Sequence, residues 1–503
     1  MIESAVVIGA GFGGLAAAVR LRALGYRVTV VDALDQPGGR ARAFRRDGYV
    51  FDAGPTVITA PYLLDELFSL VGRDRREAFE LTEVDPFYRV RFPHGGHFDY
   101  VGDEERLLAQ IERLSPRDVD GYRRFAAHAE RIFDVGYTQL ASAPFDRLNE
   151  MLRVVPSMIR LESFRSVYGL AAKYFQSEEL RQVFSFQPLL VGGNPFTTTS
   201  IYALIHWLER KWGVWFARGG TTAIVAALVK LLQDLDVEVR THSRVTRILQ
   251  TNGKVSGVEL ESGARLHADL VVADGDPAMI HRLLDAPGRE AKKSARMSAS
   301  MSLFVAYFGT DKKYEDVKHH TIVLGPRYRG LLEDIFKNKV LAKDFSLYLH
   351  RPTATDPSLA PAGHDAWYVL SPVPNLESGV DWAAQAEPYR QAIFQSLEQS
   401  LLPGLGQHLT TSFSIDPRHF QSDYHTASGA AFGPEPVLTQ SAWFRNHNRS
   451  NDVPGLYFVG AGAHPGAGVP GVLCSAKVME RVVPRPAEPL PLPTRRPILA
   501  RAA

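Results

Sequence analysis

Short runs of aliphatic and β-branched residues recur along the chain, and several are followed by glycines and then by a helical pattern. Near the N-terminus, residues 5–8 predict a buried strand, 15–24 a helix and 28–31 a second strand. Near the C-terminus, residues 455–459 predict another strand, which leads into a glycine-rich turn and the start of a helix. Strands that alternate with helices in this way are typical of parallel βαβ units.

The same pattern returns in the middle of the chain. Residues 222–232 predict a helix, and 270–274 predict a buried strand that ends at Asp274. Between them lie three short strand patterns, punctuated by glycine turns, at residues 237–240, 245–249 and 258–261. We therefore expect a discontinuous first domain made of residues 1–75, 214–290 and 441–480.

The turn after the first predicted strand carries the glycine pattern of a dinucleotide-binding site. Its sequence is Gly9-Ala10-Gly11-Phe12-Gly13-Gly14, directly between a strand and a helix. Gly9 permits a tight turn, Gly11 lets the backbone approach a pyrophosphate, and Gly14 lets the helix pack closely on the strand. The free N–H groups at the start of the helix favour phosphate binding. Asp32 follows the second strand, where its carboxylate is expected to accept hydrogen bonds from a ribose.

A second set of small and basic residues follows this acid. Gly39 and Arg40 belong to a Pro-Gly-Gly-Arg stretch, and Pro55, Thr56 and Val57 come soon after it. Backbone amides and a guanidinium at these positions offer contacts to a second stretch of phosphate and to a ribityl chain. A nicotinamide enzyme has no need for this second set, so the pattern favours FAD over NAD. The alternative interpretation is a plain glycine turn followed by a hairpin.

The glycine-rich segment near the C-terminus is a further place where backbone can contact a flat cofactor. Gly460, Ala461 and Gly462 follow the predicted strand, and Val469 and Pro470 begin the predicted helix. Proline suits the first helical turn, because the N–H group that it lacks has no intrahelical partner there. Together with Asp274, these residues complete the predicted cofactor-binding set.

Two potentially reactive residues lie in or near this segment. His464 acts either as a catalytic base or as a residue that orients the loop against a ligand. Cys474 has no activating partner nearby in the sequence, so we expect a small helix residue rather than a nucleophile.

These motifs predict an α/β fold class, in which a Rossmann-type FAD-binding domain is interleaved with a second domain. Residues 76–213 and 291–440 are expected to form this second domain, an α+β unit that binds substrate and associates with a membrane. Residues 481–503 are rich in proline and arginine, so this tail is expected to lack regular structure and to be disordered. A chain of 503 residues has ample length for both domains.

Composition restricts the partners and the compartment. The 57 Lys and Arg residues balance the 55 Asp and Glu residues, so no overall attraction to nucleic acid is expected. The single cysteine forms no intrachain disulfide and no cysteine-based zinc site, which favours the cytoplasm. Residues 5–25 lack the basic start of a signal peptide, and no run of about 20 apolar residues is long enough to span a bilayer. We expect a protein that is soluble or lies on a membrane surface.

Together the motifs resemble those of the FAD-dependent carotenoid desaturases, in particular the bacterial-type phytoene desaturases. The resemblance extends from residue 5 to about residue 477, and its most specific parts lie in the middle of the chain. These are Leu-Val-Gly-Gly-Asn-Pro-Phe at 190–196, Trp-Gly-Val-Trp-Phe at 212–216, Arg-Gly-Gly at 218–220 and the stretch at 434–445 that ends in Ala-Trp-Phe-Arg. Asp32 departs from the glutamate that is more common in such enzymes, although its shorter side chain is still expected to reach a ribose.

The resemblance implies that the protein oxidises phytoene, a long uncharged polyene, stepwise to more conjugated carotenoids such as lycopene. A substrate without polar groups must be held by apolar burial, which favours a deep channel reached from the cytosolic face of a membrane. The implied electron acceptor is a quinone or oxygen. Desaturation of a later hydroxy- or methoxy-carotenoid and flavin-dependent isomerisation without net oxidation remain alternatives. An amine oxidase would need an aromatic cage or an acidic pocket that the sequence does not indicate.

The resemblance also implies roles for three residues outside the glycine motifs. Val245 is expected to contact adenine through its backbone. Glu150 and Arg153 are the candidate catalytic residues, with the carboxylate accepting a proton and the arginine holding it, because an i, i+3 spacing places both on one helix face. The alternative for this pair is an ordinary surface ion pair.

Three further features have alternative interpretations. Residues 151–175 combine apolar and basic positions, which fits either an amphipathic helix pair in a membrane interface or a core helix whose arginines reach solvent. His319 and His320 have no further ligand at metal spacing, so no metal site is predicted. A cluster of aromatic residues lines an apolar tunnel or belongs to an ordinary core; its members are Tyr202, Trp207, Trp212, Trp215 and Phe216.

Overall fold

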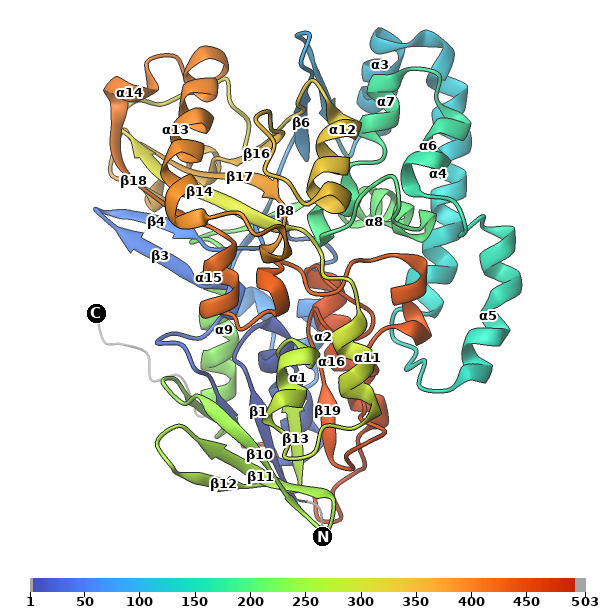
Figure 1. Ribbon diagram of the computed structural model, residues 1–503, viewed down its shortest axis with the longest axis vertical. Coiled ribbons are helices and arrows are strands. Elements are labelled where there is room, and N and C mark those ends of the chain that lie inside the picture. The colour runs from blue at the N-terminus through green and yellow to red at the C-terminus, as the bar shows by residue number, and fades with distance from the viewer. Residues whose placement is uncertain (1–2, 494–503) are drawn as a thin grey trace.

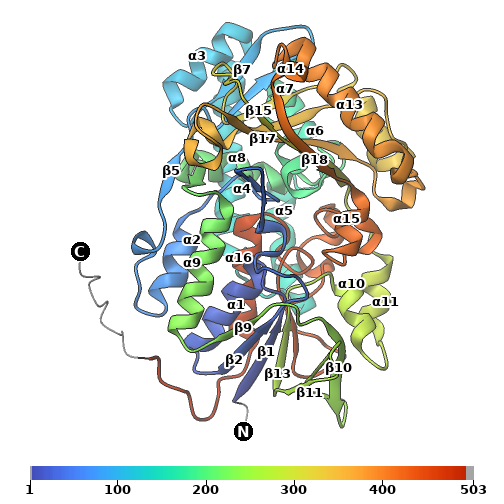
Figure 2. The ribbon, with the colours of Figure 1, turned by 90° about the vertical axis from the view of Figure 1, so that its left-hand side faces the viewer.

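A computed structural model describes residues 3–493 and shows two interleaved bodies (Figures 1 and 2). The lower body in Figure 1 is built on a five-stranded parallel sheet, and the upper body on a seven-stranded sheet. The chain passes between the bodies repeatedly, so each is assembled from segments that lie far apart in the sequence. The predicted α/β class is confirmed.

The five-stranded sheet of the lower body is buried on both faces. Its order is β19 (Leu456–Phe458), β13 (Leu270–Ala273), β1 (Ser4–Ile8), β2 (Arg27–Val31) and β9 (Glu238–Arg240). Ala5 and Val7 of β1 belong to the core formed with the helices α1, α9 and α16, whereas Val6 belongs to the core on the opposite face. Because successive side chains alternate between faces, burial of both faces requires the unbroken apolar run found in β1.

The lower body is completed on each side of this sheet. One face is covered by α1 (Phe12–Ala23), α9 (Thr221–Asp234), α16 (Val469–Val482) and α2 (Tyr62–Ser69). The other face is covered by an antiparallel sheet of β10 (Val245–Thr251), β11 (Lys254–Leu260) and β12 (Arg265–His267). Two short helices, α10 (Pro277–Ile280) and α11 (Arg289–Arg296), follow β13.

The seven-stranded sheet separates the upper body into two layers. Its order is β18 (Leu409–Ile415), β14 (Ser302–Thr310), β17 (Asp365–Val373), β16 (Leu347–His350), β15 (His320–Val323), β6 (Tyr88–Arg91) and β7 (His97–Tyr100). Phe304 and Trp367 pack against α13 (Trp382–Ser400) on one face. Leu303 and Val305 lie on the opposite face, in a core shared with most of the upper helices.

These upper helices come mainly from one long stretch between β7 and β8. They are α3 (Glu104–Leu114), α4 (Val119–Phe133), α5 (Leu148–Arg160), α6 (Val167–Tyr174), α7 (Glu178–Val183) and α8 (Leu204–Trp212). Later in the chain follow α12 (Tyr328–Glu333), α14 (Leu405–His408) and α15 (Pro417–Ser422). Two short strand pairs, β3 (Ala43–Arg46) with β4 (Tyr49–Asp52) and β5 (Leu81–Glu83) with β8 (Trp215–Ala217), complete the fold.

The stretch at 151–175 forms two helices, α5 and α6, as one of the two interpretations predicts. The interpretation as a core helix is wrong for α5, because Met151 is its only fully buried residue. Leu152 and Ile159 are 61% and 64% exposed, and Phe164, just after the helix, is 67% exposed. Figure 1 shows α5 at the edge of the molecule, with one side free of other elements.

The described part of the C-terminal tail, up to residue 493, forms no helix or strand after α16, yet residues 484–491 are held against the end of α1 and Tyr26. Arg22 donates hydrogen bonds to the carbonyls of Leu490 and Pro491 at 3.1 and 2.5 Å, and the Tyr26 hydroxyl donates to that of Pro484 at 2.5 Å. The predicted disorder therefore does not hold for this part of the tail, because the buried side chains of Arg22 and Tyr26 supply donors that composition does not reveal. Residues 494–503 lie outside the described residues.

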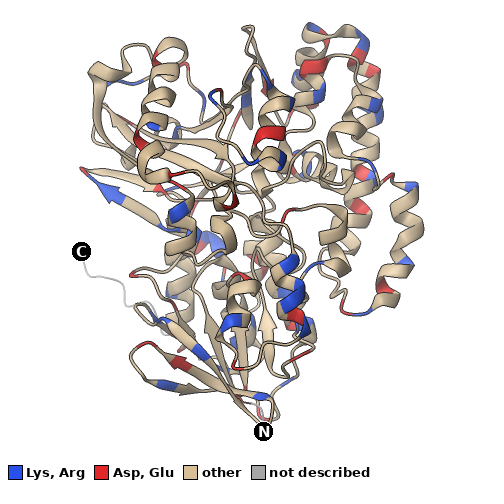
Figure 3. Cartoon of the chain, viewed as in Figure 1, with Lys and Arg blue, Asp and Glu red and all other residues tan. Residues whose placement is uncertain are grey.

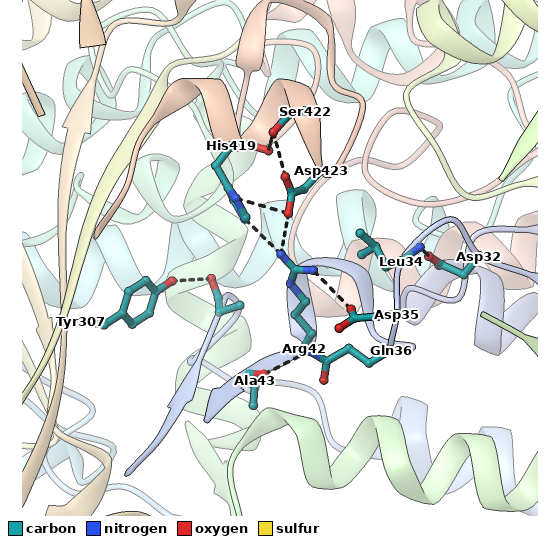
Figure 4. A network of polar contacts seen from close by, with 11 residues as sticks. Asp32, Leu34, Asp35, Gln36, Arg42, Ala43, Tyr307, His419, Ser422 and Asp423 are labelled. Atoms are coloured by element: carbon teal, nitrogen blue, oxygen red, sulfur yellow. Dashed lines mark hydrogen bonds and ion pairs between the residues drawn. The ribbon is translucent and has the colours of Figure 1, made fainter. Parts of the chain in front are cut away.

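A polar network joins the two bodies beside the hairpin β3–β4 (Figure 4). The Arg42 guanidinium is almost completely buried; it donates to Asp423 at 2.8 Å and lies 3.3 Å from the His419 ring nitrogen. Asp35 lies 4.0 Å away on the other side of the guanidinium. Burial by itself would raise the pKa of Asp423, but hydrogen bonds from Ser422 and Arg42 outweigh this effect and hold the pKa below its ordinary value.

Replacement of the Asp423 carboxylate should destabilise the junction between the two bodies. We expect Asp423→Asn to lower the free energy of unfolding by about 1.5–3 kcal/mol near neutral pH, the usual contribution of a hydrogen bond to a charged group. Since the pKa is lowered in the folded state, this stabilisation is present above the unfolded pKa and is lost as the pH falls through the folded value. Thermal unfolding of wild type and variant should therefore converge in acid. The control is Asp120→Asn, which changes an exposed partner of Arg123; equal melting of wild type and Asp423→Asn at neutral pH would contradict the prediction.

Candidate functional site

A cavity of about 620 Å³ lies between the two bodies and is lined by both. This volume is in the range of cofactor and substrate pockets. One half is bounded by the glycine-rich turns of the lower body, and the other half by apolar side chains of the upper body. The cavity therefore has a nucleotide half and an apolar half.

The first glycine turn forms the floor of the nucleotide half. Gly9 has a φ of 98°, and a Cβ atom at Gly14 would lie 1.9 Å from the Gly9 carbonyl oxygen, so neither position accepts a side chain without a change in backbone. Gly11, Phe12 and Gly13 line the cavity. The predicted turn thus brings backbone to the cavity edge at the start of α1.

Two carboxylates hold this turn in place. The amide of Ala10 donates to Asp32 at 2.6 Å, and the amide of Leu34 donates to its other oxygen at 2.8 Å. Each oxygen keeps a second lone pair that can accept from a ribose hydroxyl. Asp274 accepts a hydrogen bond from the amide of Gly14 at 2.8 Å, and burial raises its pKa to about 6.

Asp274 also touches the second glycine-rich segment. A Cβ atom at Gly460 would lie 2.1 Å from an Asp274 carboxylate oxygen. The side chain therefore links the turn after β1 with the turn after β19, a structural role that the sequence did not reveal. Ala461, Gly462, Val469 and Pro470 line the cavity next to it.

Arg40 provides the clearest test of whether an anionic cofactor fits. Its side chain lines the cavity, its Nε atom is buried without a hydrogen-bond partner, and it forms no ion pair with any described residue. Burial lowers its pKa, with Asp274 and Asp276 opposing this effect at longer range. A buried guanidinium without a direct counter-ion is costly, so the pyrophosphate of FAD fits this position well.

Arg445 braces the second glycine-rich segment from behind. Its guanidinium is buried and donates to the carbonyls of Ala461 at 2.6 Å and Ala463 at 3.1 Å. The segment then enters α16 through Gly468, which has a φ of 93°. The helix starts at the cavity edge, where its free N–H groups favour negative charge on a bound ligand. Pro55, Thr56 and Val57 line the same region.

Six predicted site residues do not line the cavity, namely Ala10, Gly14, Gly460, Val245, Glu150 and Arg153. The first three are neighbours of lining residues in the two glycine-rich turns, whereas the other three lie elsewhere. Val245 begins β10 and pairs with Leu260, although the amide of Ser243, two residues earlier, donates to the Asp32 carbonyl at 2.7 Å. Glu150 and Arg153 lie on α5 and form no ion pair with each other within the described chain. Their catalytic role, and the adenine contact of Val245, stay predictions.

The apolar half is enclosed by α5, the turn that precedes it, α8, α12 and the inner face of the seven-stranded sheet. Its walls are almost entirely aliphatic and aromatic; examples are Leu140, Met151, Met158, Leu208, Leu303, Ile322, Leu331 and Leu370. Of the predicted aromatic cluster, Tyr202 lines this space. Trp212 instead packs against Tyr62 and Phe133, as an ordinary core residue does.

The two residues considered for reactivity are deeply buried. Burial, with Arg445 and His447 nearby, lowers the pKa of His464 to about 3, so its imidazole is neutral and only weakly basic. Burial raises the pKa of Cys474 to about 11, which leaves the thiol protonated at neutral pH. His464 therefore fits better as a lining residue than as a base, and Cys474 as a helix residue that packs in the core.

Glu209 is a site residue that the sequence reasoning missed. It lies on α8, is 1% exposed and lines the cavity. The Tyr88 hydroxyl donates to one of its carboxylate oxygens at 2.7 Å, and the other oxygen is buried without a partner. Burial raises its pKa to about 8. No signal in the sequence singled it out, because Glu209 is followed by Arg210 and Lys211 in a helix of which only His206, Leu208 and Glu209 are buried.

A third histidine joins His319 and His320, which the sequence reasoning treated as isolated. His350 ends β16 and pairs with His320 of β15 across the sheet, and ring nitrogens of all three lie within 4.8 Å of one another. One zinc ion would need ligand nitrogens about 3.5 Å apart or closer. The cluster has no anionic ligand, and nearby Arg351 adds to the effect of burial that lowers the pKa of His319 to about 3. The absence of a metal stays a prediction.

The chain belongs to the family of flavin containing amine oxidoreductases, which it matches over residues 12–478. The protein is therefore an FAD-dependent oxidoreductase, in agreement with the cradle around Arg40. Its similarity to curated proteins is closer still and groups it with bacterial phytoene desaturases. It is 48% identical over 481 residues to the lycopene-forming phytoene desaturase of Pantoea ananas, with 95% of this chain and 98% of that protein covered. It is 46% identical over 491 residues to the neurosporene-forming phytoene desaturase of Cereibacter sphaeroides, with 96% and 95% covered.

Solved structures share the fold at much lower sequence identity. Putrescine oxidase bound to putrescine has a TM-score of 0.64 at 15% identity and covers 96% of this chain and 98% of its own. An oxidoreductase from Methanosarcina mazei has a TM-score of 0.62 at 20% identity and covers 94% and 99%. These similarities confirm the predicted Rossmann-type FAD-binding fold.

The role of Arg40 can be tested by FAD binding to the cofactor-free protein. We expect Arg40→Gln to weaken FAD binding by about 10- to 100-fold, because a hydrogen bond between charged groups contributes about 1.5–3 kcal/mol. Quenching of flavin fluorescence measures the affinity. Arg45→Gln, a change at an exposed arginine of β3, is the control; equal affinities of the two variants would show that Arg40 does not bind the cofactor.

Proposed function

We propose that the protein desaturates phytoene to more conjugated carotenoids, towards lycopene, with FAD as the immediate oxidant. The observation that carries this proposal is one cavity that joins a nucleotide cradle to an apolar half. A hydrocarbon offers no polar group for recognition, so its binding must come from burial of apolar surface, at about 25 cal/mol per Å². The nearly full-length similarity to phytoene desaturases supports the same substrate.

In this proposal the apolar half positions the polyene and the nucleotide half holds the oxidant. FAD supplies a two-electron acceptor that takes a hydride from carbon. Leu208, Leu303 and Ile322 exclude water from the reacting bond and orient the chain. The N-terminus of α16 stabilises negative charge that develops on the cofactor side of the cavity.

The direct test combines purified protein, FAD, phytoene in liposomes and a quinone. The quinone is included because a quinone or oxygen is the proposed final electron acceptor. We expect new visible absorption and products that have lost two hydrogens per step. A product of unchanged mass would indicate isomerisation instead, and turnover of only a hydroxy- or methoxy-carotenoid would assign the protein to a later step. No new polyene absorption would contradict the proposal.

We further propose that the protein works at the cytosolic face of a membrane, with α5 on the bilayer. No helix in the described part of the chain combines the length and the apolar character needed to cross a membrane. Leu148, Leu152, Ile159 and Phe164 form an exposed apolar group, while Met151 and Met158 of the same helix line the cavity. One helix wall thus separates the substrate space from the outer apolar surface, which suits entry of a substrate dissolved in lipid.

Basic side chains near α5 support this orientation. Phe444, 37% exposed, belongs to a short turn that contacts α5, and it lies beside α11. Arg289, Lys292 and Arg296 of α11 are exposed, and Figure 3 shows α11 as mostly basic and α5 as mostly uncharged. Each such cation near an anionic membrane contributes about 1 kcal/mol to binding.

The membrane surface can be tested with the double variant Leu152→Glu, Ile159→Glu. We expect its binding to anionic liposomes to fall at least about 10-fold in a flotation assay, because two carboxylates replace buried apolar contacts and repel the lipid headgroups. The control is Val340→Glu, at another exposed apolar residue, 47% exposed, in the upper body. Equal flotation of both variants would place the membrane contact elsewhere.

A further inference from the structure

We infer that Glu209 is the catalytic group that accepts the proton released in each desaturation step. The inference rests on the proposed function and goes beyond it, because a desaturation needs a destination for a proton as well as for a hydride. Three observations on this residue support it, namely its position, the lack of competing bases in the apolar half, and the contacts of its carboxyl group.

Glu209 lines the cavity, and the helix that carries it is joined to the segment beside the predicted flavin site. After α8 the chain turns at Gly213 and enters β8. There the amide of Trp215 donates to the Ile58 carbonyl at 2.8 Å, and the Trp215 carbonyl accepts from the Ile58 amide at 3.3 Å. Ile58 directly follows Thr56 and Val57, which line the cavity. Backbone pairing therefore ties the end of α8 to the segment beside the predicted flavin site.

Glu209 is the only carboxylic acid of the described chain in the apolar half of the cavity. The other acids that line the cavity are Asp32, Asp274, Asp276 and Asp423, and all lie in the nucleotide half. Each of these four accepts hydrogen bonds from backbone amides or, for Asp423, from Ser422 and Arg42. They are therefore occupied in holding the fold together.

The two histidines that line the cavity are poor competitors, because burial lowers the pKa of His425 as well as that of His464. His464 is neutral with a strongly lowered pKa, so it would hold a proton only weakly. The lining tyrosines, such as Tyr328 and Tyr348, have pKa values raised by burial and are therefore protonated. A proton released from an apolar substrate in this space has Glu209 as its only good acceptor among these groups.

The contacts of the carboxyl group leave one oxygen free for this task. Tyr88 of β6 holds one oxygen, while the second oxygen is buried without a partner. Tyr100 of β7 also lies near this carboxyl group and, like Tyr88, opposes the effect of burial on its pKa, while the Tyr100 hydroxyl contacts the Nδ1 atom of His206. Burial raises the pKa of Glu209 to about 8. A pKa close to the working pH allows a group both to take up and to release a proton.

With Glu209 as the proton acceptor, every atom and electron of a desaturation step has a destination. One C–H bond of the substrate breaks and its hydrogen leaves with both electrons to the oxidised flavin. On the neighbouring carbon a second C–H bond breaks, its electron pair forms the new C=C bond, and its proton joins the Glu209 carboxylate. The carboxylic acid then loses this proton to solvent before the next step.

The first test compares Glu209→Gln with Glu112→Gln, which changes an exposed acid of α3. Glutamine keeps the shape and the Tyr88 contact but takes up no proton. We expect Glu209→Gln to bind FAD normally and to desaturate phytoene about 100- to 10,000-fold more slowly, the usual contribution of a general base. Glu112→Gln should behave as wild type. Activity of Glu209→Gln within a few-fold of wild type, or loss of activity only in Glu150→Gln, would overturn the inference.

The second test follows the carboxyl group itself in the protein without FAD. Infrared spectra should show a protonated carboxyl signal that disappears as the pH rises through about 8, and Glu209→Gln should lack it. The hydrogen bond from Tyr88 lowers the pKa, so Tyr88→Phe should shift both this titration and the rising limb of the pH–rate profile to higher pH while the plateau rate is retained. An infrared titration identical in wild type and Glu209→Gln would contradict the inference. Failure of wild type to convert phytoene would instead contradict the proposed function and leave this titration measurable.

Discussion

The close approach of two glycine-rich turns, with one buried carboxylate between them, determines the geometry of the whole site. Asp274 accepts a hydrogen bond from the start of α1 and lies against Gly460 after β19. Side chains at Gly14 or Gly460 would collide with backbone or with this carboxylate. The distance between β1, β13 and β19 is thus set by atoms that also form the floor of the cofactor cradle, and every other cavity wall is positioned relative to that floor.

The second constraint is the separation of charge from apolar surface within one cavity. Charged groups such as Arg40 and Asp32 gather where phosphate and ribose are expected, whereas α5, α8 and the seven-stranded sheet provide an apolar space with one acid, Glu209. In a low-dielectric environment an isolated carboxyl group favours its neutral form. The same burial that makes a hydrocarbon bind therefore makes this carboxyl group able to exchange a proton near neutral pH.

Much of the lower body could be predicted from the sequence because its signals are local. The strand, the glycine turn and the helix at residues 4–23 are consecutive, and their spacing reflects steric limits of one βαβ unit. The predicted lining residues Gly11, Arg40 and Pro470 accordingly meet at one cavity. The catalytic role of Glu150 and Arg153 was inferred from family resemblance and helix spacing. Spacing indicates that two residues share a helix face, but it does not indicate what that face contacts.

The sequence by itself determined the cofactor class and the mixed α/β fold, since glycine spacing and hydrophobic periodicity act over a few residues. The expectation of an apolar substrate space came from the resemblance to carotenoid desaturases. The tertiary structure alone decided which distant side chains share an environment. It brought His350 to His319 and His320, bound residues 484–491 to α1, exposed one side of α5 and buried Glu209 against Tyr88. Burial and proximity between remote segments control pKa values and access to solvent, and neither quantity is encoded in the local pattern of a sequence.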